Sequence, residues 1–192
     1  MQISGMNFVI TGAGAGIGAG TAQVAAGHGA RVMVSDTNDA NGEAVVAAIR
    51  AAGGVAFYQH CDVSDEDQVQ ALMQAAAEQL GGIDVLHNNA GIHESMLGDG
   101  LTLDSMSRST FDKVLAVNVL GPWLCSKYAL PWLRKSTQAS IINAGSTSSL
   151  TGYPNCVAYG SSKGAAMQMT KMLAVDLAAD GIRVNCYCPG SI

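Results

Sequence analysis

The stretch that decides the fold is Thr11-Gly12-Ala13-Gly14-Ala15-Gly16-Ile17-Gly18. A short apolar run precedes it and a stretch typical of a helix follows it, so it joins a strand to a helix. Gly12 permits a tight turn, Gly16 lets a pyrophosphate approach the backbone, and Gly18 lets the helix pack closely on the sheet. The amides at the start of that helix favour phosphate. We therefore predict a dinucleotide site here, with Ala15 and Ile17 also in contact with the cofactor.

The rest of the chain alternates short apolar runs with longer stretches of helical period. Strands are expected at 7–10, 31–35, 55–59, 83–87, 140–143 and 183–187. Helices are expected at about 16–28, 41–51, 64–80, 107–133 and 158–179. Ser64 and Asp67 indicate a capping box, and Pro122 indicates a kink. Alternating strands and helices predict a single doubly wound α/β domain whose parallel sheet binds its ligand at the carboxyl ends of the strands.

The composition fits one globular domain with an aliphatic core. The 192 residues include 23 glycines, and charged residues are 13%, against a usual figure of about 25%. A net charge of −5 with ten scattered Lys and Arg argues against a nucleic-acid partner, and no apolar run is long enough for a membrane span. The start shows no secretory signal, and the five cysteines are widely spaced, which favours reduced thiols in a cytoplasmic protein. Neither the cysteines nor the histidines have the spacing of metal ligands, so no metal is expected.

Asp36 ends the second expected strand, 24 residues after Gly12. A carboxylate there accepts hydrogen bonds from ribose hydroxyls and repels a 2′-phosphate. The glycine loop holds no Lys or Arg, and none follows Asp36 before Arg50. These features favour NAD over NADP. The alternative is that Asp36 only caps the helix that starts near Asn41.

Further motifs resemble those of the classical short-chain dehydrogenase/reductase family. The glycine loop resembles the family's T-G-x-x-x-G-x-G, and Tyr159 with Lys163 resembles its Y-x-x-x-K. The other matches are Asp62-Val63, Asn88-Asn89-Ala90-Gly91, Asn118, Ser146 and Pro189-Gly190. The resemblance implies an NAD(P)-dependent oxidoreductase of a small alcohol or ketone. It also implies that the cofactor is contacted by Asp62, Val63, Asn89, Ala90, Gly91, Tyr159, Lys163, Pro189, Gly190 and Ile192, and that the helices at about 107–133 and 158–179 form a homotetramer or homodimer.

The proposed catalytic residues can be interpreted from their chemistry. Tyr159 and Lys163 are four residues apart on a helix, so their side chains share a face. An ammonium nearby lowers the pKa of a phenol from about 10, which makes Tyr159 a general base in oxidation and a general acid in reduction. Ser146, 13 residues before Tyr159, is expected to bind the substrate oxygen. The resemblance implies that Asn118 holds a water between Lys163 and solvent.

Several alternatives stay open. Asn118 could be only a packing asparagine, and His93 with Glu94 could line the substrate mouth or belong to a solvated polar loop over 93–107. The protein could also be a dinucleotide-binding sensor or scaffold without turnover. An epimerase or dehydratase of the extended branch is disfavoured, because that branch usually carries the spacing G-x-x-G-x-x-G. The chain stops two residues after Gly190, so we expect it to be truncated before the family's substrate lid and seventh strand.

Overall fold

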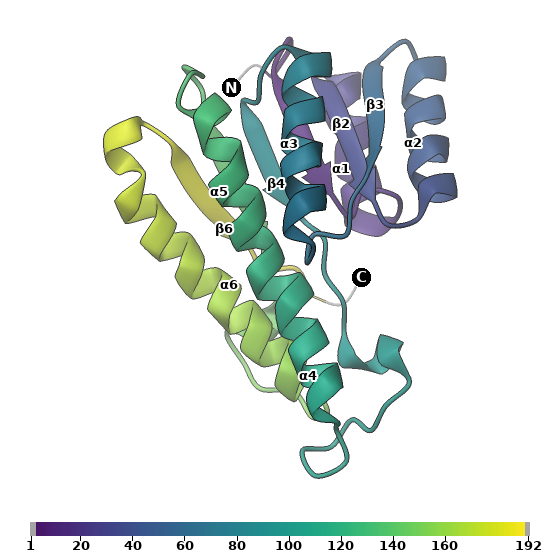
Figure 1. Cartoon of the computed structure of the whole chain (residues 1–192), viewed down its shortest axis with the longest axis vertical. Coiled ribbons are helices and arrows are strands. Elements are labelled where there is room, and N and C mark those ends of the chain that lie inside the picture. Colours follow the sequence, from purple (N-terminus) through teal and green to yellow (C-terminus); the bar gives the residue numbers. More distant parts are fainter. Residues whose placement is uncertain (1–2, 191–192) are drawn as a thin grey trace.

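A six-stranded parallel sheet forms the centre of the computed structural model, which describes residues 3–190 (Figure 1). The strand order is β3-β2-β1-β4-β5-β6, and every neighbouring pair is parallel. The strands are β1 Asn7–Thr11, β2 Arg31–Asp36, β3 Val55–His60, β4 Val85–Asn88, β5 Ser140–Ala144 and β6 Arg183–Tyr187. The prediction of a doubly wound α/β fold is confirmed.

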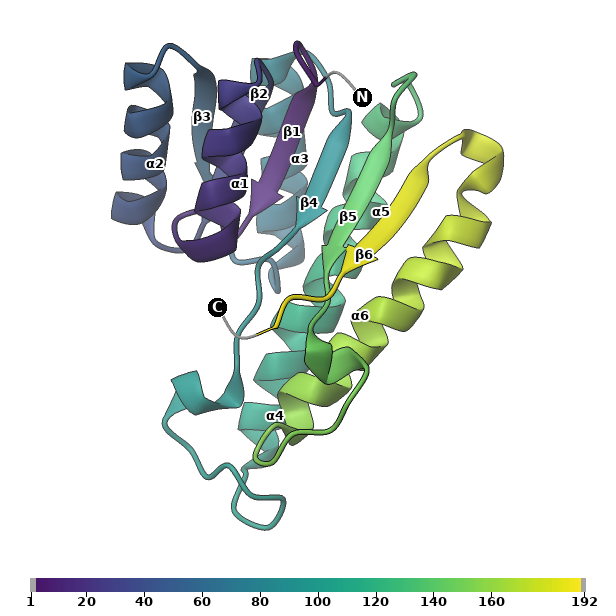
Figure 2. The ribbon, with the colours of Figure 1, turned by 180° about the vertical axis from the view of Figure 1, so that it is seen from behind.

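The helices cover the two faces of the sheet unequally (Figures 1 and 2). They are α1 Gly16–Gly27, α2 Asp39–Ala51, α3 Glu66–Leu80, α4 Arg108–Leu115, α5 Gly121–Leu133 and α6 Val157–Asp176. One core lies between the sheet and α3, α5 and the end of α6, whereas a smaller core lies under α1 and α2. On the α1 side, no helix of the described chain lies over β5 and β6 (Figure 2). An apolar groove opens on this side beside Phe8, Val24 and Ile142.

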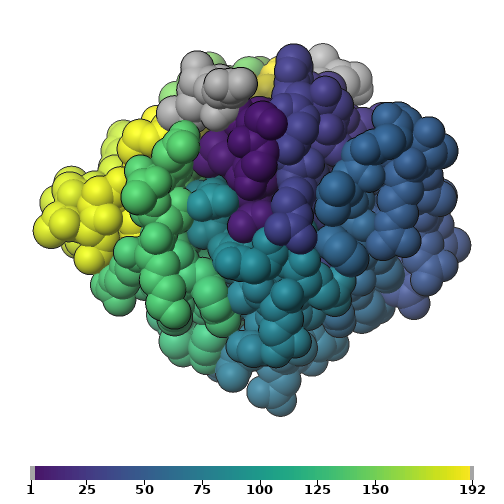
Figure 3. All heavy atoms as spheres, turned by 90° about the horizontal axis from the view of Figure 1, so that it is seen from above, coloured from purple at the N-terminus to yellow at the C-terminus, as the bar shows by residue number. Residues whose placement is uncertain are grey.

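All strands point toward one end of the molecule, where the cleft described below lies. Figure 3 looks onto the opposite end, where the turns that lead into the strands follow one another in sheet order, from blue to yellow. Among residues 3–190, no helix is long and apolar enough to cross a membrane.

The start of α3 differs from the predicted capping box. Asp65, not Ser64, is the N-cap: its carboxylate accepts hydrogen bonds from the amides of Asp67 and Gln68 at 3.0 and 3.1 Å. Ser64 is unavailable because its amide and hydroxyl both donate to Asp62 Oδ1, at 2.9 and 2.7 Å. The prediction was wrong because two neighbouring side chains could each cap the helix, and a local turn occupies one of them.

The helix expected at 107–133 is divided in a way that the sequence analysis did not foresee. Between α4 and α5 lies the π-helical segment η2 (Ala116–Leu120), whose turn is wider than that of an α-helix. The Gly121 amide donates to Ala116 O, five residues back. Pro122 stands in the first turn of α5 rather than at a simple kink. Since proline lacks an amide and its ring crowds the carbonyl four residues earlier, a wider turn before it relieves the conflict.

The other boundaries agree with the prediction or differ by at most three residues, as is usual at element ends. The expected polar loop at 93–107 contains a short 3₁₀ helix, η1 (Glu94–Leu97), and its first residue is fully buried. Glu94 therefore does not belong to a solvated loop. Two further short helices are η3 (Thr147–Ser149) and η4 (Ala178–Asp180).

Candidate active site

The glycine loop turns sharply between β1 and α1. Gly12 has φ +61°, and a Cβ added there would lie 2.7 Å from Ala90 Cα. A Cβ on Gly18 would lie 2.3 Å from Gly12 O and 2.5 Å from Asn89 Nδ2. Both distances are far too short for real contacts, so neither position tolerates a side chain without movement of the backbone.

The start of α1 is open to a ligand. Its N-cap is Ala15, which supplies no side-chain cap, and its first turn contains no acidic residue. Around Gly16, no heavy atom lies within 4 Å of an added Cβ. Uncapped amides at a helix N-terminus favour an anion, so this loop fits a pyrophosphate.

A cavity of about 600 Å³, here called the glycine-loop cavity, extends from this loop past the carboxyl ends of β2 and β3. Of the predicted cofactor residues, it is lined by Gly12, Ala15, Gly16, Ile17, Asp36, Asp62, Val63, Asn89, Ala90 and Gly91. Gly18 instead lies behind the loop, in the contact between helix and sheet. Ile192 lies outside the described residues. Lys113 of α4 also lines the cavity, a cation that the sequence analysis missed because its helix is distant in the chain.

Asp36 faces this cavity from the end of β2. Its Oδ2 accepts a hydrogen bond from the Gly14 amide at 2.8 Å, and its Oδ1 accepts one from the Asn38 amide at 2.9 Å. The cap of α2 is Asn38, whose side chain accepts from the Asn41 amide. The alternative that Asp36 only caps this helix is therefore wrong.

Asn89 connects the glycine loop to the rest of the sheet. Its Nδ2 donates to Thr11 O and Gly12 O at 3.0 and 2.9 Å. Its Oδ1 accepts from the Tyr187 hydroxyl at 3.2 Å, and His87 Nε2 lies 3.0 Å from the same hydroxyl oxygen. Tyr187 and His87 were missed, because the contact joins residues 100 positions apart and no local pattern marks it.

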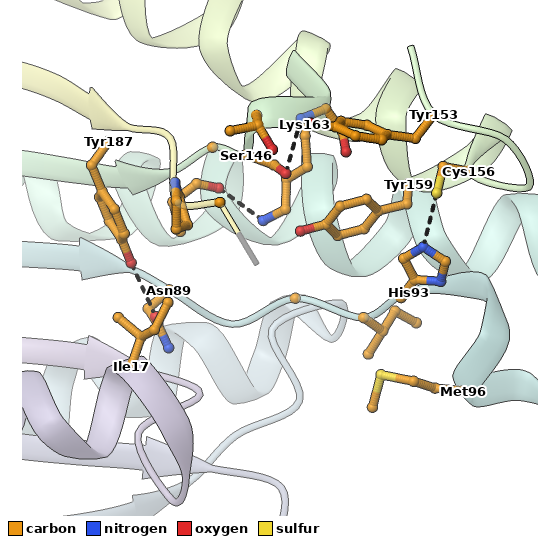
Figure 4. A pocket seen from close by; sticks show the side chains of 18 residues that line it. Ile17, Asn89, His93, Met96, Ser146, Tyr153, Cys156, Tyr159, Lys163 and Tyr187 are labelled. Carbon is orange, nitrogen blue, oxygen red and sulfur yellow. Dashed lines mark hydrogen bonds between the residues drawn. The ribbon is translucent and has the colours of Figure 1, made fainter. Parts of the chain in front are cut away.

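A second cavity of about 420 Å³, here called the tyrosine cavity, adjoins the first (Figure 4). It is lined by the predicted residues Ser146, Tyr159, Lys163, Pro189 and Gly190, which come from the ends of β5 and β6 and from α6. Both cavities share Ile17, Asn89, Gly91, Ile92 and Met96, so they form one continuous cleft. Met96, Tyr153, Cys156 and Tyr187 also line the tyrosine cavity, and none of them belongs to a motif predicted above.

Tyr159 and Lys163 lie together on the first turns of α6. The Lys163 ammonium nitrogen is 5.6 Å from the centre of the Tyr159 ring and donates to Ala144 O at 2.8 Å. Figure 4 shows the Tyr159 ring extending toward this ammonium. Lys163 is only 5% exposed, and this burial lowers its pKa to about 8. A buried ammonium with one backbone acceptor among residues 3–190 is well placed to interact with a further oxygen.

Ser146 is buried at the N-terminus of η3. Its hydroxyl oxygen accepts from the Ser148 amide at 3.1 Å, so its hydrogen remains available to a ligand in the tyrosine cavity. Ser149 donates to Lys163 O at 2.9 Å and holds this turn against α6.

Asn118 lies in η2 and lines neither cavity. Its Oδ1 accepts from the Ile92 amide at 2.8 Å, and its Nδ2 donates to Ile92 O and Ser162 Oγ, each at 2.9 Å. Its Oδ1 and Lys163 Nζ lie 3.3 and 3.2 Å from the point that a Cβ of Gly91 would occupy. The absence of a side chain at Gly91 therefore leaves space between them.

The strand order and the cleft at the carboxyl ends of the strands define a Rossmann-type dinucleotide-binding protein. The family model of short chain dehydrogenases matches residues 7–192. The chain therefore belongs to the short-chain dehydrogenase/reductase family, whose members are oxidoreductases that use NAD(P).

Known proteins agree with this assignment. A 2,5-dichloro-2,5-cyclohexadiene-1,4-diol dehydrogenase of Sphingobium indicum is 38% identical over all 192 residues, which span 74% of that protein. A cis-4-hydroxycyclohexanecarboxylate dehydrogenase of Sinomonas cyclohexanicum is 37% identical over 95% of this chain and 71% of its own length. A crystal structure from Sinorhizobium meliloti, described as a candidate short-chain alcohol dehydrogenase, superposes with a TM-score of 0.91 at 32% identity, over 98% of this chain and 73% of that one.

Proposed function

We propose that the protein transfers a hydride between a secondary alcohol, or the corresponding ketone, and NAD, with Tyr159 as the general acid/base. One observation carries the proposal: Ser146, Tyr159 and Lys163 line one cavity, which is continuous with the cavity lined by the glycine loop and Asp36. Two of the relatives are named for the oxidation of cyclic alcohols, which supports this substrate class.

The residues present fit the cofactor. The open amides of α1 suit its pyrophosphate, and the Asp36 carboxylate suits the hydroxyls of the adenosine ribose. Each Asp36 oxygen accepts one amide and keeps a further lone pair for such a bond. The negative charge of Asp36 disfavours a 2′-phosphate, which is why we propose NAD rather than NADP. When bound, NAD supplies the site that accepts or donates the hydride.

The protein's own groups handle the proton. In alcohol oxidation, the Tyr159 phenolate takes the hydroxyl proton, while the Ser146 hydroxyl donates a hydrogen bond to the substrate oxygen and orients it. The Lys163 ammonium favours the phenolate, and it would also hold the nicotinamide ribose of a bound cofactor. Asn118 holds a water that links Lys163 to solvent, and the space beside Gly91 lies next to both side chains.

Tyr159→Phe tests the proposal. NADH formation is measured across secondary alcohols, cyclic diols, sugars and steroids, and NAD binding is measured separately. We expect turnover to fall by about 10² or more while NAD still binds, because the acid/base group is lost. Tyr153→Phe is the matched control, since Tyr153 lines the same cavity but is half exposed.

Three results would contradict the proposal or a part of it. Unchanged turnover in Tyr159→Phe would exclude Tyr159 as the acid/base group. Wild-type protein that binds NAD but oxidises none of these substrates would favour a binding protein without turnover. A strong preference for NADP in the same assay would contradict the role given to Asp36.

We also propose that α5 and α6 form the interface of a homotetramer or homodimer. These helices carry exposed apolar side chains, including Trp123, Met172 and Val175, of which Val175 is 74% exposed. Contiguous exposed apolar surface is typical of an interface. Light scattering should show an oligomer that Val175→Asp weakens, and a monomeric wild type would exclude it.

A further inference from the structure

Glu94 is a fully buried carboxylate without a salt bridge to Lys or Arg in the described chain. Its Oε1 accepts a hydrogen bond from the Ala158 amide and its Oε2 one from the Tyr159 amide, both at 3.1 Å. The two amides belong to the first turn of α6, whose own N-cap, Cys156, supplies no side-chain cap. A residue more than 60 positions away therefore caps the helix that carries Tyr159.

We propose that Glu94 is a positioning residue for Tyr159, which fixes the backbone at Tyr159 and places a negative charge at the first turn of the helix that carries it. The inference rests on the proposed function of Tyr159. Burial of a carboxylate is costly, and here the paired amides and the positive end of a 20-residue helix offset that cost. A neutral residue or an ordinary N-cap at position 156 could satisfy the same amides without burying a charge.

The neighbouring His93 strengthens the link between η1 and α6. Its Nδ1 accepts from the Ser95 amide at 3.1 Å, so Nε2 carries the hydrogen and points to Cys156 Sγ at 3.3 Å. Its ring lies 4.8 Å from the Tyr159 ring, centre to centre. Two consecutive residues of one loop thus contact the backbone and the ring of Tyr159.

The titratable groups around this contact are few. His93 Nδ1 lies 3.6 Å from Glu94 Oε2, and the Glu94 charge raises the pKa of Cys156, after the larger effect of burial. Tyr159 faces Lys163 on its own helix and Tyr187 on β6. A carboxylate disfavours a nearby phenolate and an ammonium favours it, so Glu94 and Lys163 have opposite electrostatic effects at the start of α6.

The positioning role of Glu94 is tested with the variants Glu94→Gln and Glu94→Asp. Glu78→Gln is the control, and Tyr159→Phe is measured in the same assays. Glu78 is exposed near the end of α3, at the opposite end of the sheet. We expect Glu94→Gln to lower kcat about tenfold through misplacement of Tyr159, with KM for NAD within about twofold of wild type. We also expect the acidic limb of its kcat profile to move down by about half a pH unit, since removal of a negative charge favours the phenolate.

Glu94→Asp keeps the negative charge but shortens the side chain. We therefore expect its kcat to fall severalfold while the acidic limb of the pH profile stays in place. Loss of kcat in Glu94→Gln with the limb in place would mean a structural role only and would overturn the charge effect. Wild-type kcat in both variants would overturn the proposal. If Glu94→Gln fails to fold, Glu94→Asp decides: a severalfold lower kcat with KM for NAD unchanged supports the proposal, and wild-type kcat overturns it. Should Tyr159→Phe stay active, the proposed function fails instead.

Discussion

The two halves of the cleft are constructed differently. Just over half of the residues that line the glycine-loop cavity lie between 12 and 63, in and after β1, β2 and β3. The tyrosine cavity instead gathers side chains from the ends of β4, β5 and β6, from η1 and from α6. The first half relies on backbone shape, with glycines at points of closest approach, and the second relies on polar side chains held by distant partners.

This difference predicts different responses to substitution. A change in the glycine-loop half should act mainly on folding and on cofactor binding, because its residues shape the backbone. A change in the tyrosine half should act mainly on turnover. Substitution of a residue that connects the two halves should change both cofactor binding and turnover, but each by a smaller factor.

The largest effect is expected for Gly18→Ala. The new Cβ would lie 2.3 Å from Gly12 O, a backbone atom that cannot move independently. We expect the free energy of unfolding to fall by about 3 kcal/mol or more, with loss of NAD binding. In Gly20→Ala, on the same helix, an added Cβ meets nothing within 4 Å, and we expect a gain of about 0.5–1 kcal/mol. Urea denaturation measures both, and equal stability of the two variants would contradict the backbone argument.

Asp36→Asn should have the next largest effect. The amide keeps the shape of the side chain but removes the charge that disfavours a 2′-phosphate. We expect the preference for NAD over NADP to fall by about 10², mainly through KM, since the change lies far from the reacting atoms. The control is Asp39→Asn, an exposed neighbour that does not line the cavity. An unchanged ratio of kcat/KM for the two cofactors would show that Asp36 does not select between them.

The same contrast explains what the sequence could predict. All six strands and the parallel fold follow from apolar runs and helical periods. The glycine motif and Asp36 also predict part of the lining of the glycine-loop cavity. Ser146, Tyr159 and Lys163 were found only because the resemblance supplied their spacing. The periodicity of the sequence alone does not predict that these three residues line one cavity.

The features that the sequence did not reveal depend on competition or on distant contacts. Ser64 and Asp65 can both cap α3, and the bond from Ser64 to Asp62 decides between them. The π-helical turn before Pro122 is one of several ways to accommodate a proline. The burial of Glu94 depends on amides of α6, and no pattern near residue 94 indicates that contact.

His87 lies where the halves meet, and its effect should depend on pH. It is buried, its Nδ1 has no hydrogen-bond partner within the described residues, and burial lowers its pKa from 6.5 to about 4. Since the unfolded chain binds this proton more readily, the stability due to neutral His87 is complete above about pH 6.5 and is lost as the pH falls toward 4. Between pH 7 and 5, wild type should lose about 2 kcal/mol more than His87→Gln in urea denaturation. Parallel losses would mean that His87 binds its proton as readily in the folded protein as in the unfolded chain.

The smallest effect is expected for Tyr187→Phe, which removes one hydroxyl between the halves. That hydroxyl donates to Asn89 Oδ1, and Asn89 in turn holds the carbonyls of Thr11 and Gly12. We expect a loss of about 1 kcal/mol in stability and a rise of about threefold in KM for NAD, with kcat within about twofold of wild type, because the hydroxyl supports the loop. Steady-state kinetics with both substrates varied separates these terms. A tenfold fall in kcat with KM unchanged would mean that the Tyr187 hydroxyl acts in turnover rather than in support of the glycine loop. The contrast between the two halves would then not hold for this residue.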